Sequence, residues 1–376
     1  MAKLERQRHT AKVGFPVACI GITPSNQVVL GGGGGPGRSG VQNKLAVYSI
    51  GDAGLQQQSE LVLKSDEDAP TCLAVHPKEG ALVASINGTS SDIQAGSSRN
   101  LRVFALAKGR IRAGKATKTI CSSDQMDYQK CIRFSSAGSM VAGGATDGTL
   151  SVVKYPSLKP VSAFVGAADE INDVDFGEQD RWLAAATDAE IKVLLVADSS
   201  TVKSIRDPRT ASGERAVFRF ARFGTGKADV LFTVLNTRSR KSCYVVQWDT
   251  KTWARIGTRR VAHSAATTFA MSHGGDLLAV ATASLQICVC DARTLKVLLR
   301  IPAAHSFAIT ALAFDKDDRR LVSASADETC QAIVLPEAWP TAVDRLAGYA
   351  RDHSPLLAVL LAALLAVLVA LFTVHT

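Results

Sequence analysis

The sequence has few aromatic residues and no patterned cysteines. Aromatic side chains make up 6% of its 376 residues, and no two cysteines form a CxxC pair. The chain starts with charged residues and shows no secretory signal, so we do not expect a disulfide framework. We interpret the cysteines as small buried thiols in a reducing compartment. They are Cys19, Cys72, Cys121, Cys131, Cys243, Cys288, Cys290 and Cys330.

Sequence patterns of enzymatic chemistry are also missing. The seven histidines show no metal-ligand spacing, and no Gly-x-Ser-x-Gly or triad pattern occurs. We therefore expect no covalent catalysis and no organic cofactor. The formal net charge is +9, which is compatible with binding to nucleic acid, to anionic lipid or to an acidic protein. The densest basic cluster, Arg238, Arg240 and Lys241, lacks the interleaved aromatic residues of single-strand binders, and we expect no nucleic-acid partner.

One long apolar run predicts a membrane anchor. Residues 356–374 are apolar except for Thr373, and a helix of that length spans roughly 28 Å, close to a hydrocarbon core. Arg345 and Arg351 precede the run, which by the positive-inside rule places the large N-terminal part in the cytosol. We expect a cytosolic domain over 1–335, a linker over 336–355, a single transmembrane helix over 356–374 and a luminal tail of residues 375–376.

A repeat of strands fills the chain before this run. Apolar strands that end near Phe134, Phe176, Phe223, Met271 and Phe314 recur about every 42 to 48 residues, which is the period of four-stranded propeller blades. In three copies an Asp precedes the third strand, as in a WD-repeat blade: Asp147, Asp188 and Asp327. With two further copies upstream, we predict an all-β, seven-bladed WD-repeat-like β-propeller followed by the transmembrane helix. The last repeat supplies only three strands, so we expect residues near 9–14 to close the ring.

A glycine-rich segment departs from the repeat. It runs from Gly31 to Asn43 and partly imitates a phosphate-binding P-loop. However, Arg38 stands where that motif requires Lys, and the next residues, 44–50, alternate as a strand, so no helix N-terminus is available to hold phosphates. Five consecutive glycines lose much entropy on ordering, so an ordered loop needs a compensating ligand or partner. Its backbone carbonyls could coordinate a hard monovalent cation.

The segments Val13-Gly-Phe-Pro16, the glycine run and Gly40-Val-Gln-Asn43-Lys-Leu resemble one family, the membrane-anchored guanine-nucleotide exchange factors of the endoplasmic reticulum. The animal members are called prolactin regulatory element-binding proteins. The resemblance covers the whole chain. It implies a single-pass protein of the endoplasmic reticulum membrane that activates the small GTPase starting COPII coat assembly in transport to the Golgi. The rival interpretation is a tail-anchored scaffold that gathers trafficking proteins without exchange activity.

The same resemblance implies a set of site residues. It assigns GTPase contacts to Val41 and Asn43 in the loop and to Asp68 and Pro70 in the next segment. His305 is similar to a further family position, although a histidine that stabilises its blade is an equal alternative. The resemblance also implies a structural potassium ion held by the loop of Gly31, Gly32, Gly33, Gly34, Gly35, Gly37 and Gly40. Neither the exchange rate, the lipid preference nor the oligomeric state follows from the sequence.

Overall fold

A computed structural model of the chain describes residues 8–36, 39–51, 54–107, 109–161, 167, 169–177, 179–210, 212–225, 229–337 and 339. Contacts divide the chain into a unit of residues 1–335 and a second unit of residues 336–376, and the first is described below. Within the described ranges no helix is long and apolar enough to cross a membrane. The predicted transmembrane span, 356–374, lies outside those ranges.

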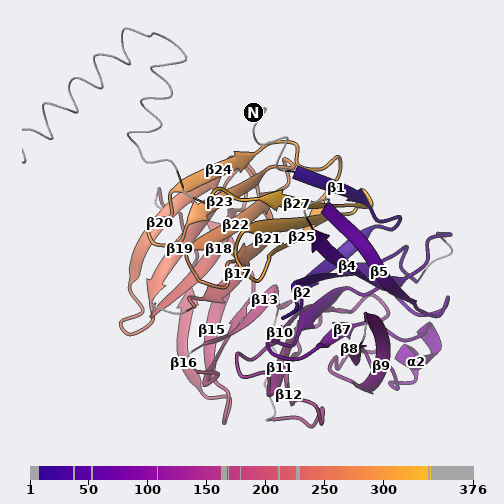
Figure 1. The fold of residues 1–376 in the computed structure, drawn as a ribbon. Coiled ribbons are helices and arrows are strands. Elements are labelled where there is room, and N and C mark those ends of the chain that lie inside the picture. The colour runs from indigo at the N-terminus through magenta and orange to yellow at the C-terminus, as the bar shows by residue number, and fades with distance from the viewer. Residues whose placement is uncertain are drawn as a thin grey trace, which may run out of the picture. The chain divides into compact units, whose positions relative to one another are not determined.

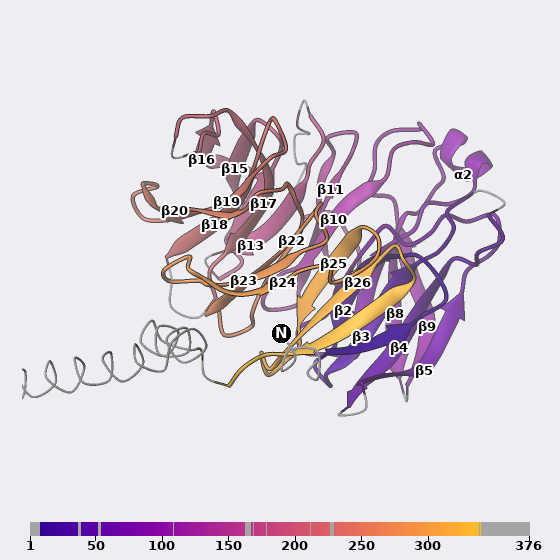
Figure 2. The same cartoon turned by 90° about the horizontal axis from the view of Figure 1, so that it is seen from above.

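The described strands form seven antiparallel sheets, each a blade of a β-propeller (Figures 1 and 2). From inside to outside, blade 1 contains β2 (Val17–Ile22), β3 (Gln27–Gly32), β4 (Lys44–Gly51) and β5 (Gly54–Val62). Blade 2 contains β6 (Cys72–Val75), β7 (Ala81–Ser85), β8 (Leu101–Ala107) and β9 (Arg110–Thr117), with the short helix α2 (Ser90–Gln94) between β7 and β8. Blade 3 contains β10 (Gln129–Phe134), β11 (Met140–Ala145) and β12 (Leu150–Lys154).

Blades 4 to 6 each have four strands. Blade 4 contains β13 (Asp173–Gly177), β14 (Trp182–Ala186), β15 (Glu190–Leu195) and β16 (Thr201–Arg206). Blade 5 contains β17 (Ala216–Phe223), β18 (Val230–Thr237), β19 (Cys243–Asp249) and β20 (Arg255–Ala262). Blade 6 contains β21 (Ala266–Met271), β22 (Leu277–Thr282), β23 (Ile287–Asp291) and β24 (Val297–Ile301).

Blade 7 is built from both ends of the propeller. It contains β25 (Ile309–Phe314), β26 (Arg320–Ser325) and β27 (Thr329–Val334), and β1 (Arg8–Lys12) adds the outer strand by antiparallel pairing with β27 (Figure 1). The innermost strands of neighbouring blades contact each other around the whole ring, and β25 contacts β2. The predictions of seven blades and of ring closure by residues near 9–14 are therefore confirmed.

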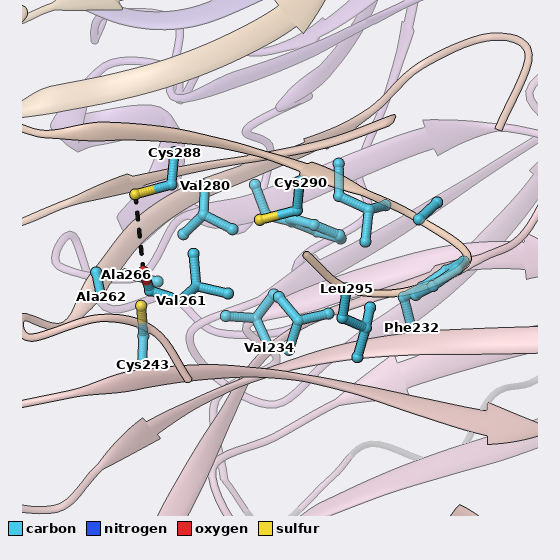
Figure 3. Packing of buried hydrophobic residues seen from close by; sticks show 14 residues of the cluster. Phe232, Val234, Cys243, Val261, Ala262, Ala266, Val280, Cys288, Cys290 and Leu295 are labelled. Carbon is cyan, nitrogen blue, oxygen red and sulfur yellow. Dashed lines mark hydrogen bonds between the residues drawn. The ribbon is translucent and has the colours of Figure 1, made fainter. Parts of the chain in front are cut away.

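The core lies between the blades. Each blade packs against a neighbour on both sides, so its second strand is buried on both faces. The sequence of such a strand is a continuous run of apolar or small residues, as in β7 (Ala-Leu-Val-Ala-Ser). Figure 3 shows one such interface, in which Phe232, Val234 and Cys243 of blade 5 meet Val280 and Cys288 of blade 6. Seven of the eight cysteines are buried, as expected, but Cys121 is exposed because it lies on the connection between blades 2 and 3.

One face of the ring carries the segments that the sequence singled out. Neighbouring strands of a blade run in opposite directions. The start of the innermost strand, the end of the second, the start of the third and the end of the fourth therefore all lie on one face of the ring. The loop 33–43 between β3 and β4 and the connection 63–71 between β5 and β6 therefore lie on the same face. The segments 86–100 and 118–128 lie there too. We call this the loop face.

Candidate functional site

The glycine loop is braced from within by one buried side chain. Asn43 is 6% exposed. Its Nδ2 donates to the carbonyl of Gly35 (2.8 Å), and its Oδ1 accepts from the Gly35 amide (3.0 Å). These two bonds join the two arms of the loop in the way that a pair of backbone hydrogen bonds joins two strands, so they fix the distance between the arms. Residues 37 and 38 lie outside the described ranges.

Asn43 also attaches the loop to the next segment. Its Nδ2 donates a second bond to the carbonyl of Glu67 (2.9 Å), and its own carbonyl accepts from the Leu63 amide (2.8 Å). Glu67 is held in turn by an ion pair with Arg102 of β8 (2.8 Å). The glycine loop and the connection 63–71 are therefore one hydrogen-bonded unit.

Glycine is required where the two arms of the loop approach each other. A Cβ on Gly33 would lie 2.5 Å from the Cα of Asn43 and 2.8 Å from the carbonyl oxygen of Gln42, and Gly33 has a φ of +143°. A Cβ on Gly34 would lie 3.0 Å from the carbonyl oxygen of Val41. The two arms are therefore in close contact, with the carbonyl oxygens of Val41 and Gln42 next to the opposite arm.

Two of the predicted GTPase contacts are available at the surface. Val41 is half-buried and borders a hollow of about 380 Å³ together with Gly40, Val62 and Leu63. Asp68 is half-buried, and its Oδ1 accepts from the Ala69 amide (2.6 Å) and lies 3.9 Å from the position of a Cβ on Gly35. Burial raises the pKa of the Asp68 carboxyl above its ordinary value.

The other three residues predicted to contact the GTPase are buried and make contacts within the fold. Asn43 points into the loop, as described above. Pro70 is buried beneath Gly31, where a Cβ on Gly31 would lie 2.9 Å from the Pro70 Cβ. The side chain of His305 is fully buried in blade 7, with Nδ1 2.7 Å from the Thr329 hydroxyl and Nε2 2.8 Å from the Ser323 hydroxyl. These contacts of His305 fit the alternative of a histidine that stabilises its blade.

The predicted potassium-loop residues divide between strand and loop. Gly31 and Gly32 are the last residues of β3, where their backbones pair with β2 and β4. Gly33, Gly34, Gly35 and Gly40 lie in the loop itself, and Gly37 lies outside the described ranges. In the part of the chain that the structure describes, no group of three or more His, Cys, Asp or Glu side chains could hold a metal ion.

The sequence did not reveal a second segment that joins this site. The Asp68 amide donates to the carbonyl of Asn87 (3.2 Å), and the Asn87 Nδ2 donates to the carbonyl of Asp127 (2.9 Å). These bonds continue the unit from blade 1 to the connection between blades 2 and 3. A buried Asn next to a glycine, at Asn87-Gly88, is a weak signal for such a bracing residue.

Comparison with known proteins finds relatives whose names contain SEC12. The chain is 27% identical to the SEC12-like protein 2 of Arabidopsis thaliana over 309 residues, which cover 80% of this chain and 74% of that protein. It is 24% identical to the guanine nucleotide-exchange factor SEC12 of Candida glabrata over 341 residues (86% and 72% of the two chains). The protein of that name from Mus musculus is 25% identical over 247 residues (60% and 59%).

Two further comparisons concern the fold. The family model "WD domain, G-beta repeat" matches residues 296–331. A chain in the crystal structure of the mitotic checkpoint complex superposes with a TM-score of 0.64 at 12% sequence identity, covering 88% of this chain and 94% of that one. At that identity the likeness shows the propeller fold alone.

Proposed function

We propose, from the premise that this chain is a Sec12-like WD-repeat propeller, that it is a guanine-nucleotide exchange factor for the small GTPase that initiates COPII coat assembly. The observation that carries the proposal is the braced glycine loop. Its base is fixed by the buried Asn43, while Pro36, Ser39 and Gly40 are exposed. Such a loop can enter a narrow site because its backbone carries few side chains.

Exchange requires differential binding and no covalent step. A factor that binds the nucleotide-free GTPase more tightly than the loaded form lowers the barrier to nucleotide release. The bonds from Asn43 to Gly35 and Glu67 order the loop before docking, so less conformational entropy is lost on binding. We expect the loop to compete with the phosphates and Mg²⁺ near the switch regions of the GTPase.

Asp68 adds a charge to this competition. Its carboxylate lies beside the loop at Gly35 and is only partly solvated. Where the loop enters the nucleotide site, this negative charge repels the nucleotide phosphates and attracts the lysine that binds them. Both effects favour the nucleotide-free complex over the loaded one.

We also propose that the loop holds a structural potassium ion. The carbonyl oxygens of Gln42 and Val41 lie close to the opposite arm, 2.8 Å and 3.0 Å from the positions of a Cβ on Gly33 and on Gly34. Uncharged backbone oxygens are the ligands that potassium takes in proteins. We propose that these carbonyls, with those of Gly33 and Gly34, hold the ion, which would supply positive charge that offsets the repulsion between converging carbonyl dipoles.

We further propose that the protein acts at the endoplasmic reticulum membrane, anchored through residues 356–374 with the propeller in the cytosol. Activation next to the bilayer would let the GTPase insert as soon as it is loaded. The names of the relatives and the apolar composition of 356–374 support this placement. The competing scaffold function predicts binding of the same GTPase without faster nucleotide release.

The test is release of a fluorescent GDP analogue from the COPII GTPase, with the full-length chain in detergent, in potassium and then in sodium buffer. We expect release to accelerate with the chain and to slow when sodium replaces potassium. Acceleration that is equal in the two buffers would refute the potassium site alone. Binding of the GTPase without acceleration would refute exchange and favour the scaffold.

A further inference from the structure

Exposed hydrophobic side chains gather on the loop face. Among the described residues, the exposed large hydrophobic side chains are Val62, Met126, Tyr128, Ile256 and Phe307. All except Ile256, which lies near the start of β20, belong to loop-face connections or to the strand end that leads into one. Met126 is the most exposed, at 80%. Met126 and Tyr128, two residues apart on the connection between blades 2 and 3, form one exposed apolar site on this face, and such a site can be covered by a partner.

The segment that carries Met126 is held rigidly. The Met126 amide donates to the Asp124 carboxylate (2.9 Å), and the Asp127 amide donates to the Asp124 carbonyl (3.2 Å). Thr146 of blade 3 fixes the next residues, since its hydroxyl accepts from the Tyr128 amide (3.0 Å) and donates to the Asp127 carboxylate (2.8 Å). A side chain displayed on an ordered turn costs little backbone entropy when it is buried by a partner.

This segment is continuous with the glycine loop. The bonds from Asn43 to Glu67, from Asp68 to Asn87 and from Asn87 to Asp127 form an unbroken path across the loop face from blade 1 to blade 3. The other exposed aromatic residue of this face, Phe307, lies on the connection between blades 6 and 7. Among the residues that the structure describes, no backbone hydrogen bond joins that connection to the glycine loop.

We propose that Met126 and Tyr128 are a second contact for the GTPase that the glycine loop engages, and that they bind an apolar patch outside its nucleotide site. This inference rests on the proposed function for the identity of the partner. Because the methionine side chain is flexible and polarisable, Met126 fits an irregular apolar surface well, and Tyr128 adds an aromatic surface with a polar end.

The position of this contact determines which kinetic constant it controls. Met126 lies a full blade away from the loop, so it stabilises the loaded and the nucleotide-free complexes equally. Uniform binding of this kind changes the concentration dependence of exchange and leaves the maximal rate unchanged. A substitution in the loop, in contrast, lowers the maximal rate.

The test measures GDP release over a range of concentrations of the full-length chain, together with binding to the nucleotide-free GTPase. We expect Met126→Ser to raise the half-saturating concentration of the chain about 5- to 30-fold and to leave the maximal exchange rate unchanged. Met126→Leu should keep the half-saturating concentration of the wild type. Ile256→Ser is the matched control, since Ile256 is also exposed (55%) but lies away from the loop face, and it should behave like the wild type.

The outcomes separate this proposal from the proposed function. Wild-type kinetics for Met126→Ser, or a larger effect of Phe307→Ser, would overturn the Met126 contact while exchange itself stands. If the wild-type chain binds the GTPase without accelerating release, exchange fails, and weaker binding by Met126→Ser still supports the contact. If the wild-type chain does not bind the GTPase, both proposals are overturned.

Discussion

Substitution of Asn43 by alanine removes the brace of the glycine loop and tests how exchange depends on it. The change deletes three hydrogen bonds, two to Gly35 and one to Glu67, with lengths of 2.8 to 3.0 Å. At about 1 kcal/mol each, the ordered loop loses about 3 kcal/mol relative to alternative conformations. That free energy corresponds to roughly a 100-fold change in the population of the ordered loop.

We therefore expect Asn43→Ala to reduce the exchange efficiency of the chain by about 10- to 100-fold, measured as GDP release from the COPII GTPase. The lower end applies if docking on the GTPase reorders the loop. The effect should be at least as large for Asn43→Asp, which keeps an oxygen that accepts from the Gly35 amide but places its second carboxylate oxygen against the carbonyl oxygens of Gly35 and Glu67.

A second buried asparagine provides a matched control. Asn236 of β18 is 5% exposed and makes a similar pair of bonds to Ala266, donating to its carbonyl (3.0 Å) and accepting from its amide (2.7 Å). Asn236→Ala should destabilise the propeller by a similar amount without touching the loop. If both variants show the same exchange at equal folded fractions, or if Asn43→Ala retains full activity, loop ordering does not determine exchange and the reasoning is wrong.

Three further outcomes follow from the structure. Gly33→Ala should lower exchange far more than Gly40→Ala, because a Cβ at Gly33 collides with Asn43 whereas nothing lies within 4 Å of one at Gly40; equal losses would contradict this. Burial lowers the pKa of His305, so below pH 6.5 the unfolded chain binds a proton that the folded chain does not, and stability falls as the pH drops. His305→Gln should flatten that dependence in urea melts from pH 7.5 to 5, and an unchanged slope would exclude His305 as the cause. A thiol reagent should label Cys121 alone in the native propeller, and rapid labelling of a second cysteine would show that a blade opens.

The repeat spacing was sufficient to predict the propeller because every blade buries both faces of its sheet against its neighbours and so needs the same pattern of apolar strands. The innermost strands end at the anchors Phe134, Phe223, Met271 and Phe314 as predicted, and the unpaired third strand of the last repeat required a partner from the other end of the chain. Strand number and ring closure depend on backbone pairing, which the periodic pattern encodes directly.

The site was less predictable because it depends on the direction of single side chains. Asn43 and Pro70 belong to segments that lie at the loop face, yet both side chains turn inward. Residue type could not show this, since an asparagine serves equally as an exposed contact or as a buried brace. Met126 was missed because one exposed methionine in a polar connection produces no pattern in sequence.

The closure of blade 7 by β1 also has a consequence for synthesis of the protein. Residues 8–12 leave the ribosome before the other strands of the propeller, but their partner, β27, is made roughly 300 residues later. At about 5 to 20 residues per second, β1 waits some 15 to 60 s without its native pair. Throughout that time blade 1 also lacks its neighbour β25, so two apolar surfaces remain open to aggregation. The nascent chain therefore needs protection until the last blade is complete, and this need is set by the order of the strands along the chain.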